Sequence, residues 1–345
     1  MEKFELEVYT FGRCVVRVTS GSKSRNVPCS HKKGFGILFL TALSKGPVSV
    51  NNIATRLWEE LDVKSVLSNF YANLHLLRQD LKLPSEAIHV KNGQVQLDVS
   101  SVFLDYRYFL DKFEEAFASG NSEKEHKLIE AKCIYQGDFL PDFYDEEWTV
   151  SFRESARDRY ISILEELAKI YTVSFRHDKA LEAAREILSL DPYNERGHFW
   201  KCVNYTKLGR VGKAKKHYKD AYERFRQELG MGLSFSFKDV LHWNPSEDSQ
   251  GASTVSEEEL IEYLNTAKVP ILYIDMVLSH NHLNPSLLSR LFRIGDILSI
   301  NDRNIKVILR GVSKESAKKM VERVSTRICE GFECKVVRID WKHKE

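Results

Sequence analysis

Residues 63–81 read VKSVLSNFYANLHLLRQDL, and this stretch decides how the first part of the chain folds. The apolar residues Phe70, Leu74, Leu77 and Leu81 follow one another at spacings of 4, 3 and 4 residues, which places them on one face of an α-helix. A proline three residues further on cannot continue the helix. The stretch therefore predicts a helix over residues 63–81 that packs this face against a core.

The opposite face of the predicted helix carries small, mostly uncharged side chains. Its members are Lys64, Ser65, Ser68, Asn69, Ala72, Asn73 and Leu76. A solvated helix face usually carries pairs of Glu and Lys, and this one has none. Asn can bind adenine through two atoms, and Ala or Leu can contact the methyl group of thymine. The face predicts contacts with DNA bases by Ser68, Asn69, Ala72, Asn73 and Leu76.

The segments around this helix predict a winged helix-turn-helix over residues 1–100. The expected elements are strands at 4–9 and 14–18, a helix at about 31–44, a second helix capped by Ser49, and a hairpin at 88–97. The hairpin turns at Asn92-Gly93, the dipeptide that most strongly favours a two-residue β-turn. Any other small α+β domain is the alternative that this pattern leaves open.

Basic residues are modestly enriched in the same segment. Residues 1–100 hold 13 Lys and Arg against 9 Asp and Glu, whereas the whole chain has a net charge of only +2. Positive charge near a base-reading helix is expected to contact phosphates. The predicted phosphate contacts are Lys32, Lys33, Arg56, Lys64, Arg78, Lys82 and Lys91.

Residues 101–241 predict an all-α domain of tetratricopeptide (TPR) type. Lys179 and Lys213 lie 34 residues apart in similar segments, as do Tyr171 and Tyr205. A 34-residue period in helical sequence is typical of such repeats, in which stacked helix pairs bury their apolar faces. The apolar and Tyr positions here are therefore expected to form the core.

The last third of the chain predicts a linker and a small third domain. Residues 242–259 are rich in Ser, Pro, Gly and acidic residues without periodicity, which favours a flexible linker. Residues 260–345 alternate as strand 269–277, helix 285–293, strands 296–300 and 305–310, helix 313–329 and strand 333–341. This order predicts a ferredoxin-like βαββαβ domain, and the chain as a whole is expected to be a multidomain α+β protein.

Length and composition exclude several other classes. The 345 residues suggest two or three domains, and no run approaches the eighteen apolar residues of a membrane span. The six cysteines lie far apart without a CxxC pair, which argues against a zinc site or a disulfide scaffold and fits a reducing cytosol. We find no phosphate-binding loop or nucleophile motif, and His280 and His282 read as a polar loop. The expectation is a cytoplasmic protein that is not an enzyme and holds no metal or cofactor.

Short motifs along residues 1–240 resemble those of the SARP-type bacterial transcriptional activators. They are Leu57-Trp58, Leu74-x-x-Leu77-Arg78-x-x-Leu81, Tyr135-x-Gly137-Asp138-Phe139-Leu140, Trp148 with Arg153 and Arg157, Asp191-Pro192-x-x-Glu195, Gly209-Arg210 and Glu228-Leu229-Gly230. In that family a response-regulator-type winged helix precedes a bacterial transcriptional activator domain built on TPR repeats.

The resemblance implies sequence-specific binding to double-stranded DNA near promoters and recruitment of RNA polymerase. It places the five base-contact candidates in the major groove. Family members often carry Arg where this chain has Ser68, His75 and Leu76, so the target sequence is expected to differ.

The C-terminal module is similar to a degenerate diguanylate-cyclase (GGDEF) domain. The similar residues are Ile274-Asp275, Arg293-x-x-Asp296, Val307-Ile308-Leu309, Ala317 and Glu322-Arg323-Val324, while Asn301-Asp302-Arg303-Asn304-Ile305 replaces the signature. The glycines and the acidic pair of the signature are absent, so the resemblance implies a non-catalytic sensing or dimerisation module.

The sequence leaves two functions and some partners open. The first function is a DNA-binding activator, and the second is a TPR scaffold or adaptor whose winged helix binds protein instead of DNA. A nucleotide or small-molecule ligand of the C-terminal domain and a homodimer are further partners to be tested, whereas no membrane is expected.

Overall fold

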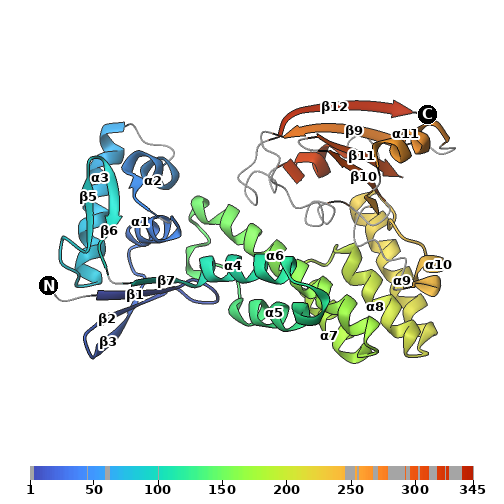
Figure 1. The fold of residues 1–345 in the computed structure, drawn as a ribbon, viewed down its shortest axis with the longest axis horizontal. Helices are drawn as coiled ribbons and strands as arrows, with labels where there is room; N and C mark the ends of the chain where they lie inside the picture. Colours follow the sequence, from blue (N-terminus) through green and yellow to red (C-terminus); the bar gives the residue numbers. More distant parts are fainter. Residues whose placement is uncertain are drawn as a thin grey trace. The chain divides into compact units, whose positions relative to one another are not determined.

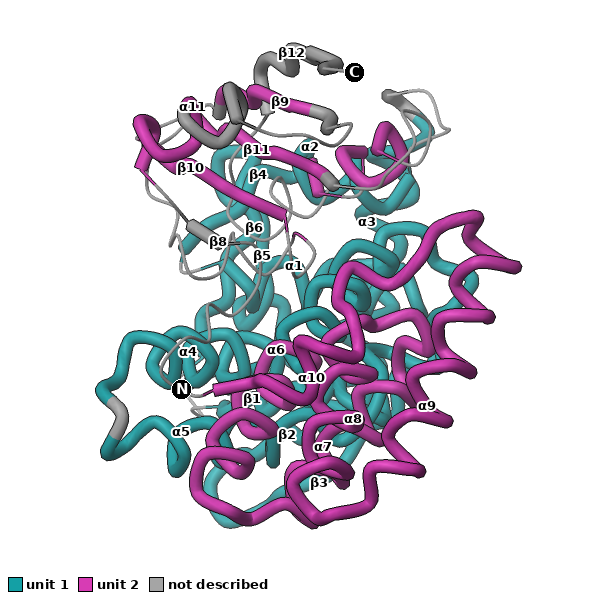
Figure 2. The backbone as a smooth tube through the Cα atoms, turned by 90° about the vertical axis from the view of Figure 1, so that its right-hand side faces the viewer, with its two compact units in different colours: residues 1–160 teal, residues 161–345 magenta. Residues whose placement is uncertain are grey.

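The computed structural model describes residues 4–44, 46–58, 63–99, 101–244, 253–254, 256–266, 271–278, 292, 296–301, 304–310, 317–322, 324–325 and 336–344. The chain divides into two compact units, residues 1–160 and 161–345 (Figure 2). None of the helices in the described part of the chain has the length and apolar character that a bilayer-crossing segment needs.

The first sheet of unit 1 has the strand order β3-β2-β1-β7 (Figure 1). Its strands are Phe4–Tyr9 (β1), Val15–Ser20 (β2), Lys23–Pro28 (β3) and Ser101–Leu104 (β7). The predicted strands at 4–9 and 14–18 are confirmed. The edge strand β3 reads KSRNVP and is largely exposed, so its sequence carries no apolar alternation from which to predict it.

The three predicted helices and the hairpin follow in the predicted order. They are α1 (Lys32–Leu43), α2 (Val50–Leu57), α3 (Val63–Asp80), β5 (Ile88–Lys91) and β6 (Gln94–Leu97), with β4 (Val48–Ser49) completing a sheet of order β4-β6-β5. Asn92 and Gly93 have φ angles of 52° and 72°, which are the left-handed values that a type I′ hairpin turn requires. Ser49 stands at the N-cap of α2 but makes no side-chain capping hydrogen bond, so that detail of the prediction is wrong.

A disulfide joins Cys14 to Cys29, although the sequence argued against a disulfide scaffold. Strands β2 and β3 pair with Val15 opposite Pro28, so Cys14 and Cys29 are the next two residues to face each other across this hairpin. Their Cα atoms lie 5.7 Å apart, within the range that a disulfide spans. The prediction failed because β3, which sets this register, was not recognised.

Unit 1 continues into helices that pack on the first sheet and on α1. They are α4 (Asp105–Ala118), α5 (Asn121–Ile134), two short 3-10 turns η1 (Pro141–Phe143) and η2 (Glu147–Thr149), and the first half of α6 (Val150–Val173). The fully buried Phe39 of α1 has its ring 5.1 Å from that of Phe139 and 5.7 Å from that of Trp148. Aromatic packing of this kind ties α1 to the segment that precedes α6.

Unit 2 begins with an array of antiparallel helices. They are α7 (His177–Leu190), α8 (Glu195–Lys207), α9 (Val211–Arg224), a π-helical turn η3 (Phe225–Leu229) and α10 (Phe237–His242). Helix α8 packs against both α7 and α9 (Figure 1). Its residues Phe199, Trp200 and Val203 are buried in one core cluster with Ala184 of α7 and Val240 of α10. The helical TPR-like part that the 34-residue period predicts is present.

A second sheet closes unit 2 with the strand order β12-β9-β11-β10-β8. Its bounds are Ser253–Thr254 (β8), Ile271–Leu278 (β9), Ile297–Asn301 (β10), Asn304–Arg310 (β11) and Val336–Lys344 (β12), with α11 at Glu257–Thr266. The four long strands pair antiparallel throughout, and β8 lies inside the segment that was expected to be a linker. Of the predicted helix at 285–293 the structure describes only Phe292, and His280 and His282 lie outside the described residues.

Candidate nucleic-acid interface

Helix α3 buries the face that its sequence predicts. Phe70, Leu74 and Leu77 are at most 4% exposed, and Leu81 just beyond the helix is 2% exposed. Helix α3 packs on α1 and α2, which contribute apolar residues to the same core. This packing fixes which side of α3 faces outward.

The five predicted base-contact residues differ in how far their side chains are exposed to solvent. Ser68 and Ala72 are exposed, whereas Asn69, Asn73 and Leu76 are half-buried on one flank of the outward face. The Nδ2 atom of Asn73 donates a hydrogen bond to the backbone oxygen of Asn69 over 2.9 Å. The side chain of Lys64 lies outside the described residues.

Three exposed residues of α3 were missing from the prediction. They are Tyr71, which is 50% exposed, together with His75 and Gln79. The series Ser68, Ala72, His75 and Gln79 has spacings of 4, 3 and 4, so it forms the stripe directly opposite the buried one. Continuing the helical periodicity by one turn would have found His75 and Gln79.

Three of the predicted phosphate contacts are already bound within unit 1. Lys33 Nζ donates to the backbone oxygen of Leu57 over 2.7 Å and lies 2.7 Å from a carboxylate oxygen of Glu146. Lys32 pairs with Asp145 in the same segment. The guanidinium of Arg78 donates two hydrogen bonds, of 2.9 and 2.6 Å, to the backbone oxygen of Ile88 in the hairpin.

The other described phosphate-contact candidates are exposed. They are Arg56 at the end of α2, Lys82 just after α3, and Lys91 beside the hairpin turn. Within the described part of the chain, none of the three has a recorded ion-pair partner. The structure therefore separates the predicted phosphate contacts into a group that holds unit 1 together and a group whose charge faces solvent.

A buried carboxylate at the start of α4 binds the backbone just after the C-terminal end of β1. Asp105 accepts hydrogen bonds from the backbone nitrogen of Thr10 at 2.7 Å, from the Thr10 hydroxyl at 2.6 Å and from the backbone nitrogen of Phe11 at 3.1 Å. Burial raises the pKa of Asp105, and these hydrogen bonds to the charged form oppose the rise. The residue acts as an internal anchor.

The motif residues around Asp138 form a second anchor. The Asp138 carboxylate accepts hydrogen bonds from Tyr135 at 3.1 Å, from Arg157 at 2.8 Å and from Tyr144. Burial alone would raise the pKa of Asp138, but the hydrogen bonds from Tyr144 and Arg157 bring it below its usual value. Arg153, 7% exposed, donates to the backbone oxygen of Phe139 at 3.1 Å. These motif residues therefore support the fold.

Two glycines let the sheet and the Asp138 segment touch. A Cβ atom on Gly12 would lie 2.6 Å from the backbone oxygen of Gln136, and one on Gly137 would lie 3.1 Å from the Cα atom of Gly12. The backbone nitrogen of Gly12 donates to the oxygen of Asp138 over 3.0 Å. Any side chain at these positions would force the two segments apart.

Residues 104–240 match the family model described as the bacterial transcriptional activator domain, BTAD. This part of the chain is similar to bacterial transcriptional activator domains. The recognition of a SARP-type activator from its motifs is thereby confirmed. The Asp138 anchor with Arg153 and Arg157 lies inside the BTAD segment, and Asp105 lies at its start.

A solved structure shares the fold. EmbR of Mycobacterium tuberculosis, in complex with a low affinity phosphopeptide, aligns with a TM-score of 0.55 at 14% identity, covering 80% of this chain and 76% of EmbR. At that identity the likeness shows a common mixed α+β architecture. A search of curated proteins finds no match to this sequence. No cluster of three or more His, Cys, Asp or Glu that could hold a metal ion occurs among the residues that the structure describes.

Proposed function

We propose that the chain is a transcription regulator that binds double-stranded DNA in a sequence-specific manner through α3. The observation that carries the proposal is the outward stripe of α3, which stays exposed in a chain that also carries a BTAD. An α-helix fits the major groove, and hydroxyl and amide groups on its outward face can bind base edges there. Recruitment of RNA polymerase is the activating step that we propose for the BTAD.

Asn73 keeps the groups needed to recognise adenine. One hydrogen of its Nδ2 is used by the backbone of Asn69, which leaves a second hydrogen and the side-chain oxygen. Adenine presents one acceptor and one donor in the major groove, and this remaining pair complements them. The internal hydrogen bond also orients the amide before binding, which lowers the entropy lost on contact.

We assign the phosphate contacts first to Arg56, Lys82 and Lys91. Their exposure lets them approach DNA without breaking an internal bond. Lys32, Lys33 and Arg78 would have to give up the carboxylates and carbonyl groups that they bind in unit 1. Lys64 remains a predicted contact from the sequence.

A salt titration of DNA binding by the full chain tests the proposal. Neutralising about 3–4 phosphates per bound chain gives a log–log slope of about −3 to −4 in salt concentration, with tighter binding to the preferred site than to random duplex. A slope near zero, or equal affinity for all duplexes, would overturn the proposal and favour the TPR scaffold. The preferred site is found by capturing genomic DNA fragments on the purified chain.

For the C-terminal module we propose a ferredoxin-like, non-catalytic sensing or dimerisation domain. The support is the antiparallel strand order β12-β9-β11-β10, which a split βαβ plan produces when its four strands are numbered 4-1-3-2. The resemblance to a degenerate GGDEF domain remains part of this proposal. A thermal-shift screen of nucleotides against the full chain, with sedimentation at several concentrations, tests ligand binding and dimerisation separately.

A further inference from the structure

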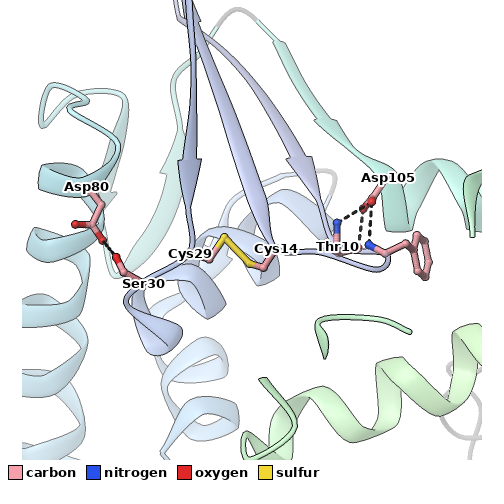
Figure 3. Close-up of a disulfide and its surroundings, with 7 residues drawn as sticks. Thr10, Cys14, Cys29, Ser30, Asp80 and Asp105 are labelled. Carbon is pink, nitrogen blue, oxygen red and sulfur yellow. Dashed lines mark hydrogen bonds between the residues drawn. A yellow bond between two sulfur atoms is a disulfide. The ribbon is translucent and has the colours of Figure 1, made fainter. Parts of the chain in front are cut away.

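The Cys14–Cys29 disulfide lies between two points at which the first sheet is fastened. Figure 3 shows Thr10 held by Asp105 on the Cys14 side, and Ser30 beside Asp80 on the Cys29 side. Asp80 is the last residue of α3. The disulfide therefore closes the β2–β3 hairpin. Directly after the hairpin, the chain contacts the end of α3 and enters α1.

The Cys29 arm of the hairpin binds the C-terminal end of α3 at three points. Ser30 Oγ donates to the Asp80 carboxylate at 3.2 Å, and His31 Nδ1 lies 2.5 Å from the same oxygen. Arg25 of β3 donates to the backbone oxygen of Leu81. These contacts come from an edge strand and the three residues after it, so they depend on β3 staying paired with β2.

The two sulfur atoms differ in access. Cys14 is 6% exposed, whereas Cys29 is half-buried and stands between the exposed residues Pro28 and Ser30, directly after the edge strand. A small thiol or disulfide can reach the Cys29 side of the bond first. Accessible disulfides exchange more readily than enclosed structural ones.

We propose that Cys14 and Cys29 form a reversible thiol–disulfide exchange site whose state sets how firmly β3 holds the C-terminal end of α3. One step of the argument rests on the proposed function. A protein that acts on chromosomal DNA works where small thiols keep most cysteines reduced, and disulfides that form there are mostly transient or redox-sensing. The closeness of Cys14 to Cys29 and the exposure of Cys29 do not depend on that function.

The co-reactant is a low-molecular-weight disulfide. The Cys29 thiolate attacks one of its sulfur atoms, which forms a mixed disulfide and releases one small thiol. The Cys14 thiolate then attacks Cys29 Sγ and releases the second small thiol. Two electrons and two protons thus pass from the cysteine pair to the small disulfide, and a monothiol reverses both steps.

The first test measures exchange in the full chain under native conditions. The protein is equilibrated with a monothiol and its disulfide at several ratios, quenched with acid, alkylated, and analysed by mass spectrometry of the peptides containing Cys14 and Cys29. We expect the pair to change from mostly oxidised to mostly reduced without denaturant, and to change back. A pair that opens only in denaturant, or never oxidises, would overturn the proposal.

The second test compares hydrogen exchange and melting of the oxidised and reduced chains. Reduction should speed amide exchange at residues 29–36 and 78–83, leave α7–α9 unchanged, and lower the melting temperature of unit 1 by roughly 5–10 °C. Identical exchange in both states would contradict the coupling. Cys14→Ser should behave as the reduced chain in either buffer, while Cys133→Ser, which removes an exposed free cysteine, should still respond.

DNA binding is measured last on the same two states. We expect weaker binding by the reduced chain. If neither state binds DNA but the exchange and melting differences persist, the proposed function fails and the thiol–disulfide site stands. If both states bind DNA equally and also exchange amides equally, the redox inference fails alone.

Discussion

The outward face of α3 and the anchors around Asp105 and Asp138 use polar residues in opposite ways. In the described part of α3 the exposed side chains are Ser68, Tyr71, Ala72, His75 and Gln79, and none of them carries a carboxylate, ammonium or guanidinium group. In the anchors, the buried Asp105 and the half-buried Asp138 accept hydrogen bonds from their own chain. The difference indicates that the two anchor carboxylates hold the fold, while the uncharged stripe of α3 remains available for a partner.

Removal of the Asp105 carboxylate should have the largest effect. Asp105→Ala leaves the buried nitrogens of Thr10 and Phe11 without their acceptor, which should lower the unfolding free energy by about 3–5 kcal/mol. Chemical denaturation measures this loss. Asp111→Ala removes an exposed carboxylate from the same helix and should change stability by less than about 0.5 kcal/mol. Similar losses in both variants would show that Asp105 is not an anchor.

Truncation of Asn73 tests the other half of the comparison. Asn73→Ala should weaken binding to the preferred DNA site by about 1–3 kcal/mol, relax one base position, and leave stability nearly unchanged. Binding isotherms on the preferred and the randomised duplex measure the difference. Gln227→Ala removes an exposed amide in η3 and serves as the matched control, which should leave DNA binding unchanged. An equal loss on every duplex would mean that Asn73 only positions the DNA backbone.

Unit 2 contains a polar pair of its own, formed by the buried His198 and the half-buried His217. His198 Nε2 lies 2.9 Å from the backbone oxygen of Pro192 and therefore donates to it, so His198 Nδ1 accepts from His217 Nε2, also at 2.9 Å. Burial lowers the pKa of His198, and burial also lowers the pKa of His217 to about 3. The native pair is thus uncharged near neutral pH.

This pair should make unit 2 sensitive to mild acid. An unfolded histidine has a pKa of about 6.5, so the stabilisation is complete above that pH and is lost as the pH falls from about 6.5 toward 3. Because His217 is only half-buried, we expect its share of the loss between pH 7.5 and 5 to be about 1–2 kcal/mol. Urea denaturation at the two pH values should show a smaller loss for His217→Gln. An unchanged pH dependence would contradict the assignment.

Two lysines give the smallest effects and the sharpest contrast. Lys91→Ala should reduce the salt slope of DNA binding by about 0.9 without altering the melting temperature. Lys33→Ala should lower stability by about 1–2 kcal/mol and leave the slope unchanged, because its ammonium group binds Leu57 and Glu146. The reverse result would place Lys33 at the DNA and Lys91 in the fold.

The sequence was most informative where the determining interactions are local. The buried stripe of α3 and the turn at Asn92-Gly93 follow from helical periodicity and from one dipeptide, and both are confirmed. The ion pair of Lys32 with Asp145 joins residues 113 positions apart, so no local pattern reveals it. The assignment of Lys32 to phosphate therefore could not take its internal partner into account.

Other features were hidden by weak local signals. The polar strand β3 shows no apolar alternation, and without it the facing of Cys14 and Cys29 could not be inferred. Once a hairpin at residues 15–28 is assumed, counting outward by one residue on each side finds the pair. The base-contact set was incomplete for a different reason, since Tyr71 and His75 lie on the exposed side but were not among the small uncharged residues.

The place of β7 has a practical consequence for dissecting the chain. It is separated from β1 by more than ninety residues, yet it lies parallel beside it with Val8 opposite Leu104. A fragment that ends at residue 100 would leave the backbone hydrogen-bonding groups of Glu5–Val8 unpaired on the side that β7 covers. It would also lose the Asp105 anchor. An unpaired edge strand can pair with strands of other chains, so such a fragment is expected to aggregate. A fragment that extends through residue 160 retains β7 and keeps β1 paired on both sides.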